Sequence, residues 1–301
     1  QYVIGCDGIQ DEMRKYTPAW AEQVTGVPST TIERVAREYA AAKHNALAHP
    51  GWRTSNFINS FQTERAIATL NALSGNVLTA GGCLSADVTA EGAGLGVPPQ
   101  PPYPRVSALR LDGTPWKYPL VPLKLGVFQE LRDVILTGEP YQAHGWFISR
   151  QNPIMSLPDR AKTMQAFGKM DFIATVDIIM NDTAWYSDVV LPEASYLERY
   201  DPLLPVGDKA FIRQPVIEPQ GEARSALWIY KQLGERLGLS DYFQYIDDED
   251  YIRQPLVPVG VTLGKTKNRG YAEMPPEEEK EEIVFNTPSG KIEVYSETLA
   301  N

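Results

Sequence analysis

The sequence predicts an α/β protein built on a parallel sheet. Two apolar runs, Gly145–Ser149 and Phe172–Val176, are typical of short buried strands, and the segment from Pro158 to Phe167 between them favours a helix. A strand, a helix and a second strand at this spacing form a βαβ unit, in which the strands are parallel and the crossover is right-handed. A further apolar run, Val189–Leu191, is stopped by Pro192.

The composition is that of an ordinary globular protein, with 43% hydrophobic and 22% charged residues among 301. The net charge of −10 argues against nucleic-acid binding, because an acidic surface repels phosphate backbones. No apolar run reaches the length of a membrane span. The first residues lack the basic start and apolar core of a signal peptide. Since the chain starts without Met, we expect a piece of a longer protein.

Two helices are expected before residue 76. The first has a potential capping box of Thr30 and Glu33, after which apolar residues recur at helical spacing up to Ala40. The second covers 61–74 and ends at Gly75, because glycine accepts the left-handed conformation that often terminates helices. Both helices precede the predicted sheet.

A long segment rich in proline and glycine, 79–122, interrupts this regular pattern. Loops of such length are usually functional, and we expect this one to wrap across a neighbouring surface. Regular signals return with helices at 128–136 and 226–237. A turn at Thr287–Gly290 then precedes a last strand, Ile292–Tyr295.

Polar residues stand where two of the predicted strands end. Asn152 follows the first strand and Asp177 follows the second. Adjacent parallel strands place these residues at one edge, where open α/β sheets bind ligands. A carboxylate suits a guanine base, because its oxygens accept from the ring N–H and the exocyclic amine together. The structural alternative, which the residues alone favour, is an Asx turn at Asn152 and a cap at Asp177.

Other motifs indicate no reaction centre. Gly92–Gly96 looks like a phosphate loop, but Val97–Pro99 excludes the helix that should follow it. The three histidines show no metal-ligand spacing, so we expect no metal ligand here. Cys6 and Cys83 belong to no CxxC pair, which excludes a zinc ribbon or an iron–sulfur motif. Two buried thiols are favoured over one disulfide.

Arg53 lies in a loop, Gly51–Asn56, shortly before the helix at 61–74. A guanidinium there can hold an anionic substrate or a phosphate. The structural alternative is a surface salt bridge, which the residues alone favour.

Five segments carry a resemblance to a known family. They are Gly51–Arg53 with Arg65–Ile67, Leu70–Asn76 and Gly81–Gly82; Gln151–Ser156; Asp177–Glu198; Gly221–Arg224 with Trp228; and Thr287–Ser296. In this order they resemble the blocks of the molybdopterin oxidoreductases of the dimethyl sulfoxide reductase family. The resemblance covers nearly the whole chain, and it is the order of the five blocks that makes it specific.

The resemblance implies a parallel-sheet, Rossmann-like domain of the molybdopterin oxidoreductase fold. The implied cofactor is molybdenum (or tungsten) held by two molybdopterin guanine dinucleotides. Asn152 and Asp177 match positions that hold one nucleotide, which reverses the preference for a structural role. Arg53 falls where the family's loop approaches the metal, and we expect it to be the catalytic residue, steadying an anionic substrate. Further cofactor contacts are implied for Trp52, Asn56, Val176 and Arg199.

The sequence also departs from the family pattern. The iron–sulfur cysteines, the metal-ligating residue and the last domain have no counterpart, and Ala226 stands where many members place a cofactor-binding Asp. The resemblance therefore implies the middle of a subunit roughly twice as long, inactive alone. We expect 1–48 to end a preceding α/β domain and 49–240 to bind the dinucleotide, with 79–122 as its wrapping loop. Residues 241–301 would form an irregular or β connector.

Arg53 makes the chain most similar to the sulfur-compound reductases of the family. The expected function is part of a thiosulfate, polysulfide or tetrathionate reductase in anaerobic respiration, with a 4Fe–4S cluster upstream of this piece. A ferredoxin-like iron–sulfur subunit, a membrane anchor subunit and a periplasmic location are implied in the same way. The alternatives are a formate, nitrate or arsenate oxidoreductase of the same family, or a non-catalytic nucleotide-binding domain.

Overall fold

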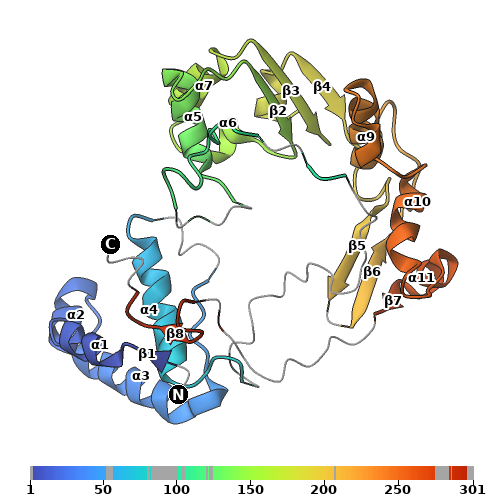
Figure 1. Cartoon of the computed structure of the whole chain (residues 1–301). Helices are drawn as coiled ribbons and strands as arrows, with labels where there is room; N and C mark the ends of the chain where they lie inside the picture. The colour runs from blue at the N-terminus through green and yellow to red at the C-terminus, as the bar shows by residue number, and fades with distance from the viewer. Residues whose placement is uncertain are drawn as a thin grey trace. The chain divides into compact units, whose positions relative to one another are not determined.

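The computed structural model describes residues 3–51, 57–79, 82, 101–103, 106–119, 121, 125–206, 208–274, 285 and 287–296. The chain forms two compact units (Figure 1): one comprises Gln1–Ala90 and Glu278–Asn301, and the other comprises Glu91–Glu277. The three-part division expected from the sequence stays a prediction. Within the described residues, no helix combines the length and the apolar character that crossing a bilayer requires.

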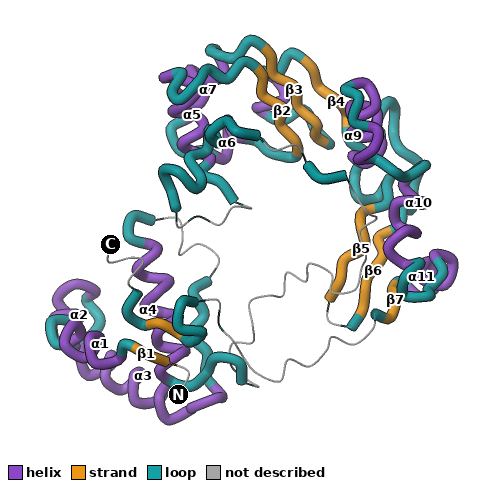
Figure 2. Tube along the Cα trace, viewed as in Figure 1, coloured by secondary structure: helices purple, strands orange, loops and turns teal. Residues whose placement is uncertain are grey.

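The first unit is mainly helical (Figure 2), and a short parallel ladder joins its two chain segments. Its elements are β1 (Val3–Ile4), α1 (Cys6–Met13), α2 (Pro18–Thr25), α3 (Ser29–Ala42), η1 (Lys43–Asn45), α4 (Ser60–Leu73) and β8 (Ile292–Glu293). In the ladder, Val3 pairs with Ile292. The buried Asn71 of α4 connects neighbouring segments, because its Oδ1 accepts hydrogen bonds from the Tyr39 hydroxyl (2.8 Å) and the Ala48 N–H (3.0 Å).

The predicted helix boundaries in this unit are partly correct. The left-handed Gly75, with φ of +70°, follows the end of α4 as predicted. The capping box is wrong, because α3 begins at Ser29, whose N–H is accepted by the Glu22 carboxylate at 3.1 Å rather than by a side chain of the predicted box. Glu33, which should have closed the box with Thr30, pairs instead with Arg37 at 3.0 Å.

A three-stranded parallel sheet in the second unit confirms the predicted βαβ arrangement. Its strands, in the order β2-β3-β4, are β2 (Gly145–Ser149), β3 (Phe172–Asp177) and β4 (Val189–Pro192). The helices associated with it are α5 (Phe128–Thr137), α6 (Pro153–Ser156) and α7 (Arg160–Phe167) (Figure 1), together with α8 (Asp182–Trp185). Strands and helices share a buried cluster of Ile148, Ile154, Phe167 and Ile173, whose removal from water stabilises the layer.

The crossover helix starts later than predicted. Asp159 is the N-cap of α7, and its Oδ1 accepts the Lys162 N–H at 3.0 Å. Pro158 lies before the helix, where its carbonyl accepts a hydrogen bond from Arg132. The Asp159 cap rather than Pro158 therefore determines where α7 begins, because an aspartate at this position accepts one of the N–H groups that have no partner within the first turn.

The second unit also contains an antiparallel sheet that was not predicted. Its strands are β5 (Asp201–Val206), β6 (Lys209–Arg213) and β7 (Tyr271–Glu273), in that order. The remaining elements are α9 (Ala226–Arg236), η3 (Ser240–Tyr242), α10 (Asp248–Arg253), η4 (Gln254–Leu256) and α11 (Leu263–Arg269). Leu203, Ala210, Ile252, Leu256 and Ala272 form its buried core. The segment expected to be an irregular or β connector, 241–301, contributes α10, η4, α11 and β7 to this layer, and its role as a connector stays a prediction.

Parts of the long loop are described, and two tyrosines in it contact other elements of the second unit. Tyr103 stacks on Tyr242 of η3, with ring centroids 5.5 Å apart. The Tyr118 hydroxyl donates to Glu130 of α5 at 2.7 Å. The described residues of 79–122 include no helix and no strand, in keeping with the prolines. The wrap expected for the whole segment stays a prediction.

Candidate functional site

The carboxyl edge of the parallel sheet gathers the polar residues that were predicted to lie there. Ser149 pairs with Val176 and Asp177 pairs with Pro192, so β2, β3 and β4 end at the same edge. Asp177 is the last residue of β3, and Asn152 lies three residues beyond β2. The predicted shared edge for Asn152 and Asp177 is confirmed.

Asp177 is half-buried and already serves the turn that follows it. Its Oδ1 accepts the Ile178 N–H at 2.7 Å, and its Oδ2 accepts from the Asn181 amide at 2.8 Å. A carboxylate offers about four acceptor positions. The two bonds from described residues fill two of these positions, so the structural role is compatible with the predicted binding role, which stays a prediction.

Asn152 is oriented by the segment after β3. Its Oδ1 accepts from the Thr183 hydroxyl at 2.8 Å and from the Thr183 N–H at 3.2 Å. The Asx turn considered for Asn152 does not form, because its side chain makes no capping bond to α6. Next to Thr183, the Arg160 guanidinium, with a smaller contribution from the Asn152 amide, lowers the pKa of Asp182.

Val176 and Arg199, two of the implied cofactor contacts, have protein partners. Val176 is fully buried, and its carbonyl accepts the Arg150 N–H at 2.9 Å. The Arg199 guanidinium binds Glu193 at 2.9 Å and Asp201 at 2.8 Å, and it also donates to the Ala194 carbonyl. Their roles toward a cofactor stay predictions.

An ion-pair network at this edge was missed from the sequence. Glu193 follows β4, and its carboxylate is held by Arg150 from the end of β2 and by Arg199. Arg199 in turn shares Asp201 with Arg213. The sequence showed only that a charged residue follows each of two predicted strands. It did not show that Arg150 and Glu193 pair, because that contact depends on the sheet register.

Other predicted residues lie outside the described part of the chain. Trp52, Arg53 and Asn56 are among them, as are Gly92–Gly96 and Cys83. Cys6 is a partly exposed free thiol rather than a buried one. The predicted roles of Trp52, Arg53 and Asn56 near a metal therefore stay predictions.

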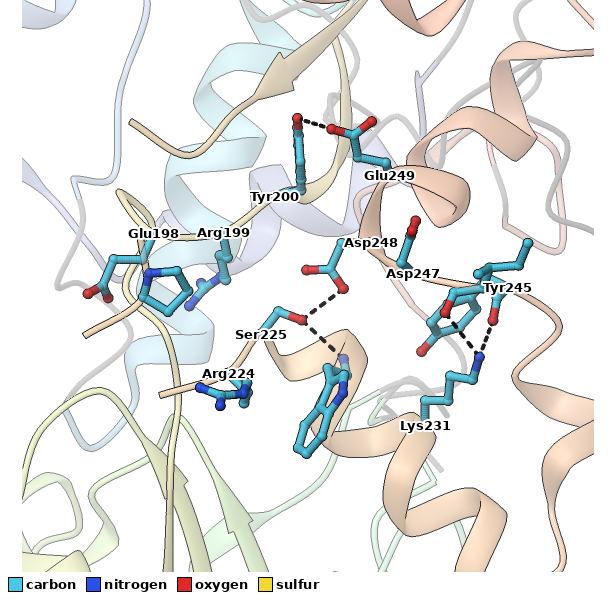
Figure 3. Close-up of a pocket in the computed structure, with 13 residues that line it drawn as sticks. Glu198, Arg199, Tyr200, Arg224, Ser225, Lys231, Tyr245, Asp247, Asp248 and Glu249 are labelled. Atoms are coloured by element: carbon cyan, nitrogen blue, oxygen red, sulfur yellow. Dashed lines mark hydrogen bonds between the residues drawn. The ribbon is translucent and has the colours of Figure 1, made fainter. Parts of the chain in front are cut away.

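A pocket of about 310 Å³ lies near Arg199 (Figure 3). Its lining includes Glu198, Arg199, Arg224, Ser225, Trp228, Lys231, Tyr245 and Asp248. The Ser225 hydroxyl donates to Asp248 at 2.8 Å and, as the N-cap of α9, accepts the Trp228 N–H at 3.1 Å.

The charged groups of this pocket are engaged by the scaffold. Glu198 accepts the Ser195 N–H (2.6 Å) and the Gln220 N–H (3.0 Å), which lowers its pKa. Lys231 donates to the backbone carbonyls of Tyr245 and Ile246. The Lys231 bonds therefore connect α9 to the segment before α10, and the lining of the pocket indicates a structural role.

Comparison with known proteins agrees with the architecture. Residues 27–236 match the family model of the molybdopterin oxidoreductases. The thiosulfate reductase molybdopterin-containing subunit PhsA of Salmonella typhimurium is 31% identical over 99% of this chain and 44% of its own length. The dimethyl sulfoxide reductase DmsA of Escherichia coli is 26% identical over 100% of this chain and 39% of its own.

A solved structure shares the fold. Acetylene hydratase from Pelobacter acetylenicus superposes with a TM-score of 0.79 at 21% identity, covering 100% of this chain and 45% of that chain. The family match and the similarity to PhsA show that the chain belongs to the molybdopterin oxidoreductase family. It spans less than half the length of each of these three proteins.

Proposed function

We propose that this chain is the cofactor-binding part of a molybdenum or tungsten reductase that acts on sulfur compounds such as thiosulfate, polysulfide or tetrathionate. The observation that carries the proposal is the carboxyl edge of the sheet, where Asp177 and Asn152 follow adjacent strands and where bonds from described residues leave two acceptor positions of the Asp177 carboxylate unfilled. Similarity to a thiosulfate reductase subunit supports the substrate class. The loop with Arg53 would steady the anionic substrate, and Trp52 and Asn56 would contact the cofactor.

The residues at this edge fit the guanine end of a dinucleotide. Asp177 can accept from the ring N–H and the exocyclic amine of guanine. Ile178, Ile179 and Met180 follow it directly and are each more than half exposed, and such apolar side chains suit the face of a planar base. Asn152 and Asn181 keep the segment in place through their bonds to Thr183 and Asp177.

Chemistry and binding are separate tasks in this proposal. The metal held by the pterins would supply electron transfer and the acceptance of oxygen or sulfur. The described residues would bind and orient the nucleotide end. The same proposal includes an iron–sulfur electron-transfer subunit, a membrane anchor subunit and a periplasmic location. Only the resemblance to the family supports these three expectations.

The test is metal and pterin analysis of the full-length gene product, combined with an assay of thiosulfate reduction by a reduced dye. We expect molybdenum or tungsten, and guanine nucleotide released on acid hydrolysis. A product without either metal and without guanine nucleotide would overturn the proposal. Metal and nucleotide without activity on thiosulfate, polysulfide or tetrathionate would retain the cofactor and reject the substrate class.

A further inference from the structure

Arg150 follows β2 directly, and its side chain crosses the edge where Asp177 lies. Its N–H donates to the Val176 carbonyl at 2.9 Å, which continues the pairing of β2 with β3 next to Asp177. Its Nε donates to both carboxylate oxygens of Glu193, at 2.9 and 2.8 Å, and its Nη2 donates to Glu193 as well. Because Glu193 follows β4, on the other side of β3, the guanidinium spans the carboxyl end of β3.

The Arg150 guanidinium retains donor capacity. Nη1 makes no hydrogen bond to any residue that the structure describes, and the side chain is 51% exposed. The Glu193 side chain is 0% exposed and has a second partner in Arg199. Glu193 therefore fixes the guanidinium from the buried side and leaves its outer nitrogen available.

The surrounding network carries excess positive charge. Arg150 and Arg199 flank Glu193, and Arg199 and Arg213 flank Asp201. Three guanidinium groups thus share two carboxylates, which leaves one positive charge uncompensated within the network. A planar guanidinium with a free N–H is well suited to a phosphate.

The backbone of Arg150 adopts an uncommon conformation. Its φ is +54°, in the left-handed region that non-glycine residues rarely occupy. The hydrogen bond to Val176 and the bidentate pair with Glu193 hold it there. Such over-determined strain is concentrated at functional positions, and here it places a cation beside the proposed guanine site.

We propose that Arg150 binds the phosphate groups of the guanine nucleotide whose base Asp177 holds. This inference rests on the proposed function and extends it from the base to the anionic part of the ligand. The carboxylate selects the base through its N–H donors, and the guanidinium binds the phosphates. The two groups belong to adjacent strand ends and act on different parts of one ligand.

Calorimetric titration of the 301-residue chain with guanosine and with GDP tests the assignment. Arg150→Gln should weaken GDP binding about tenfold and leave guanosine binding unchanged, because one charge-assisted hydrogen bond to phosphate is lost. Arg150→Lys, which keeps the charge, should retain part of the preference for GDP. In the unmodified protein, added NaCl should reduce that preference by screening.

Arg269→Gln is the matched control, since it removes the same charge from an exposed ion pair with Glu273 that lies outside this network. It should leave the affinities for guanosine and GDP unchanged. If Arg150→Gln alters guanosine and GDP binding equally or alters neither, or if the GDP preference is insensitive to salt, Arg150 does not bind phosphate.

Asp177→Asn tests the proposed function separately, because it should weaken guanosine and GDP binding alike. A normal loss with Asp177→Asn and no selective loss with Arg150→Gln would reject this inference alone. Absence of binding of both ligands to the unmodified protein would reject both. Thermal unfolding checks that each variant is folded, and Arg199 should keep Glu193 paired in Arg150→Gln.

Discussion

At the scale of single residues, the Glu193 carboxylate is the most buried charge of the candidate site. Arg150 and Arg199 reach it from two separate segments, and its own N–H donates to the Asp177 carbonyl at 3.0 Å. Removing one partner from a buried pair is costly because the other charge stays behind. Glu193 therefore links the strand ends that form the edge.

We predict that Glu193→Gln lowers the free energy of unfolding by about 3 kcal/mol, because Arg150 and Arg199 lose their shared carboxylate. Urea denaturation followed by circular dichroism measures the change. Arg37→Ala is the control, since it breaks an exposed pair with Glu33 and should have no measurable effect. A Glu193→Gln protein as stable as the parent would show that the network contributes nothing net.

Asp248 predicts how the stability of the folded protein depends on pH. Burial raises its pKa, Asp247 adds to the rise, and the Ser225 hydroxyl and Arg199 oppose it. Between the unfolded pKa near 3.8 and the raised folded pKa, the folded state binds more protons than the unfolded state. Stability therefore falls as pH increases through that window.

Asp248→Asn should remove this loss, because asparagine stays neutral and its Oδ1 can still accept from Ser225. We expect a variant at least as stable as the parent at pH 7, with the difference shrinking toward acidic pH. Thermal unfolding from pH 4 to pH 7 measures this. A variant clearly less stable at pH 7 would mean that the charged form of Asp248 is stabilising.

Sequence reasoning located Asp177 and Asn152 because each follows an apolar run that reads as a strand. It did not locate the pair of Arg150 and Glu193, which are 43 residues apart. Their contact depends on β2 and β4 lying on either side of β3. Strand order is a tertiary property, so local patterns do not contain it.

At the scale of elements, the antiparallel sheet is the part of the fold that the sequence analysis missed. β5 contains Pro202 and Pro205, which normally argue against a strand. The structure places β5 at the edge of its sheet, paired only with β6 among the described strands. A missing N–H is tolerated at an edge, so the prolines are compatible with a strand at this position.

The packing of α9 gives a prediction in which two effects oppose each other. Gly234→Ala should improve helix propensity by up to about 1 kcal/mol. A Cβ at Gly234, however, would lie 2.2 Å from Cε2 of Phe243, and such overpacking typically costs about 1–3 kcal/mol. We expect net destabilisation in thermal unfolding, because the ring of Phe243 must move.

Gly8→Ala is the matched control for this prediction. Gly8 is a helical glycine of α1, and a Cβ there would meet nothing within 4 Å. The variant should be as stable as the parent or slightly more stable. If Gly234→Ala were stabilising to the same degree, the close approach of η3 to α9 would not constrain the residue.

At the scale of the whole molecule, the fold class and the family were predictable from the sequence. The βαβ pattern gave the parallel sheet, and the order of five blocks gave the family, which the match over 27–236 shows. The division into two units could not be predicted from local sequence patterns. It depends on a pairing between residues 3–4 and 292–293, which no local signal connects.

That pairing has a consequence for the order in which the molecule is completed during synthesis. Val294 donates its N–H to the Ile4 carbonyl at 3.1 Å, and its own carbonyl accepts from Arg65 at 3.1 Å. The helical unit thus lacks part of its framework until the ribosome has passed residue 294. The unit with the binding edge, whose residues are contiguous from 91 to 277, is translated in full before then. The unit that carries the candidate site can therefore fold as an uninterrupted insertion before residues 278–301 complete the other unit.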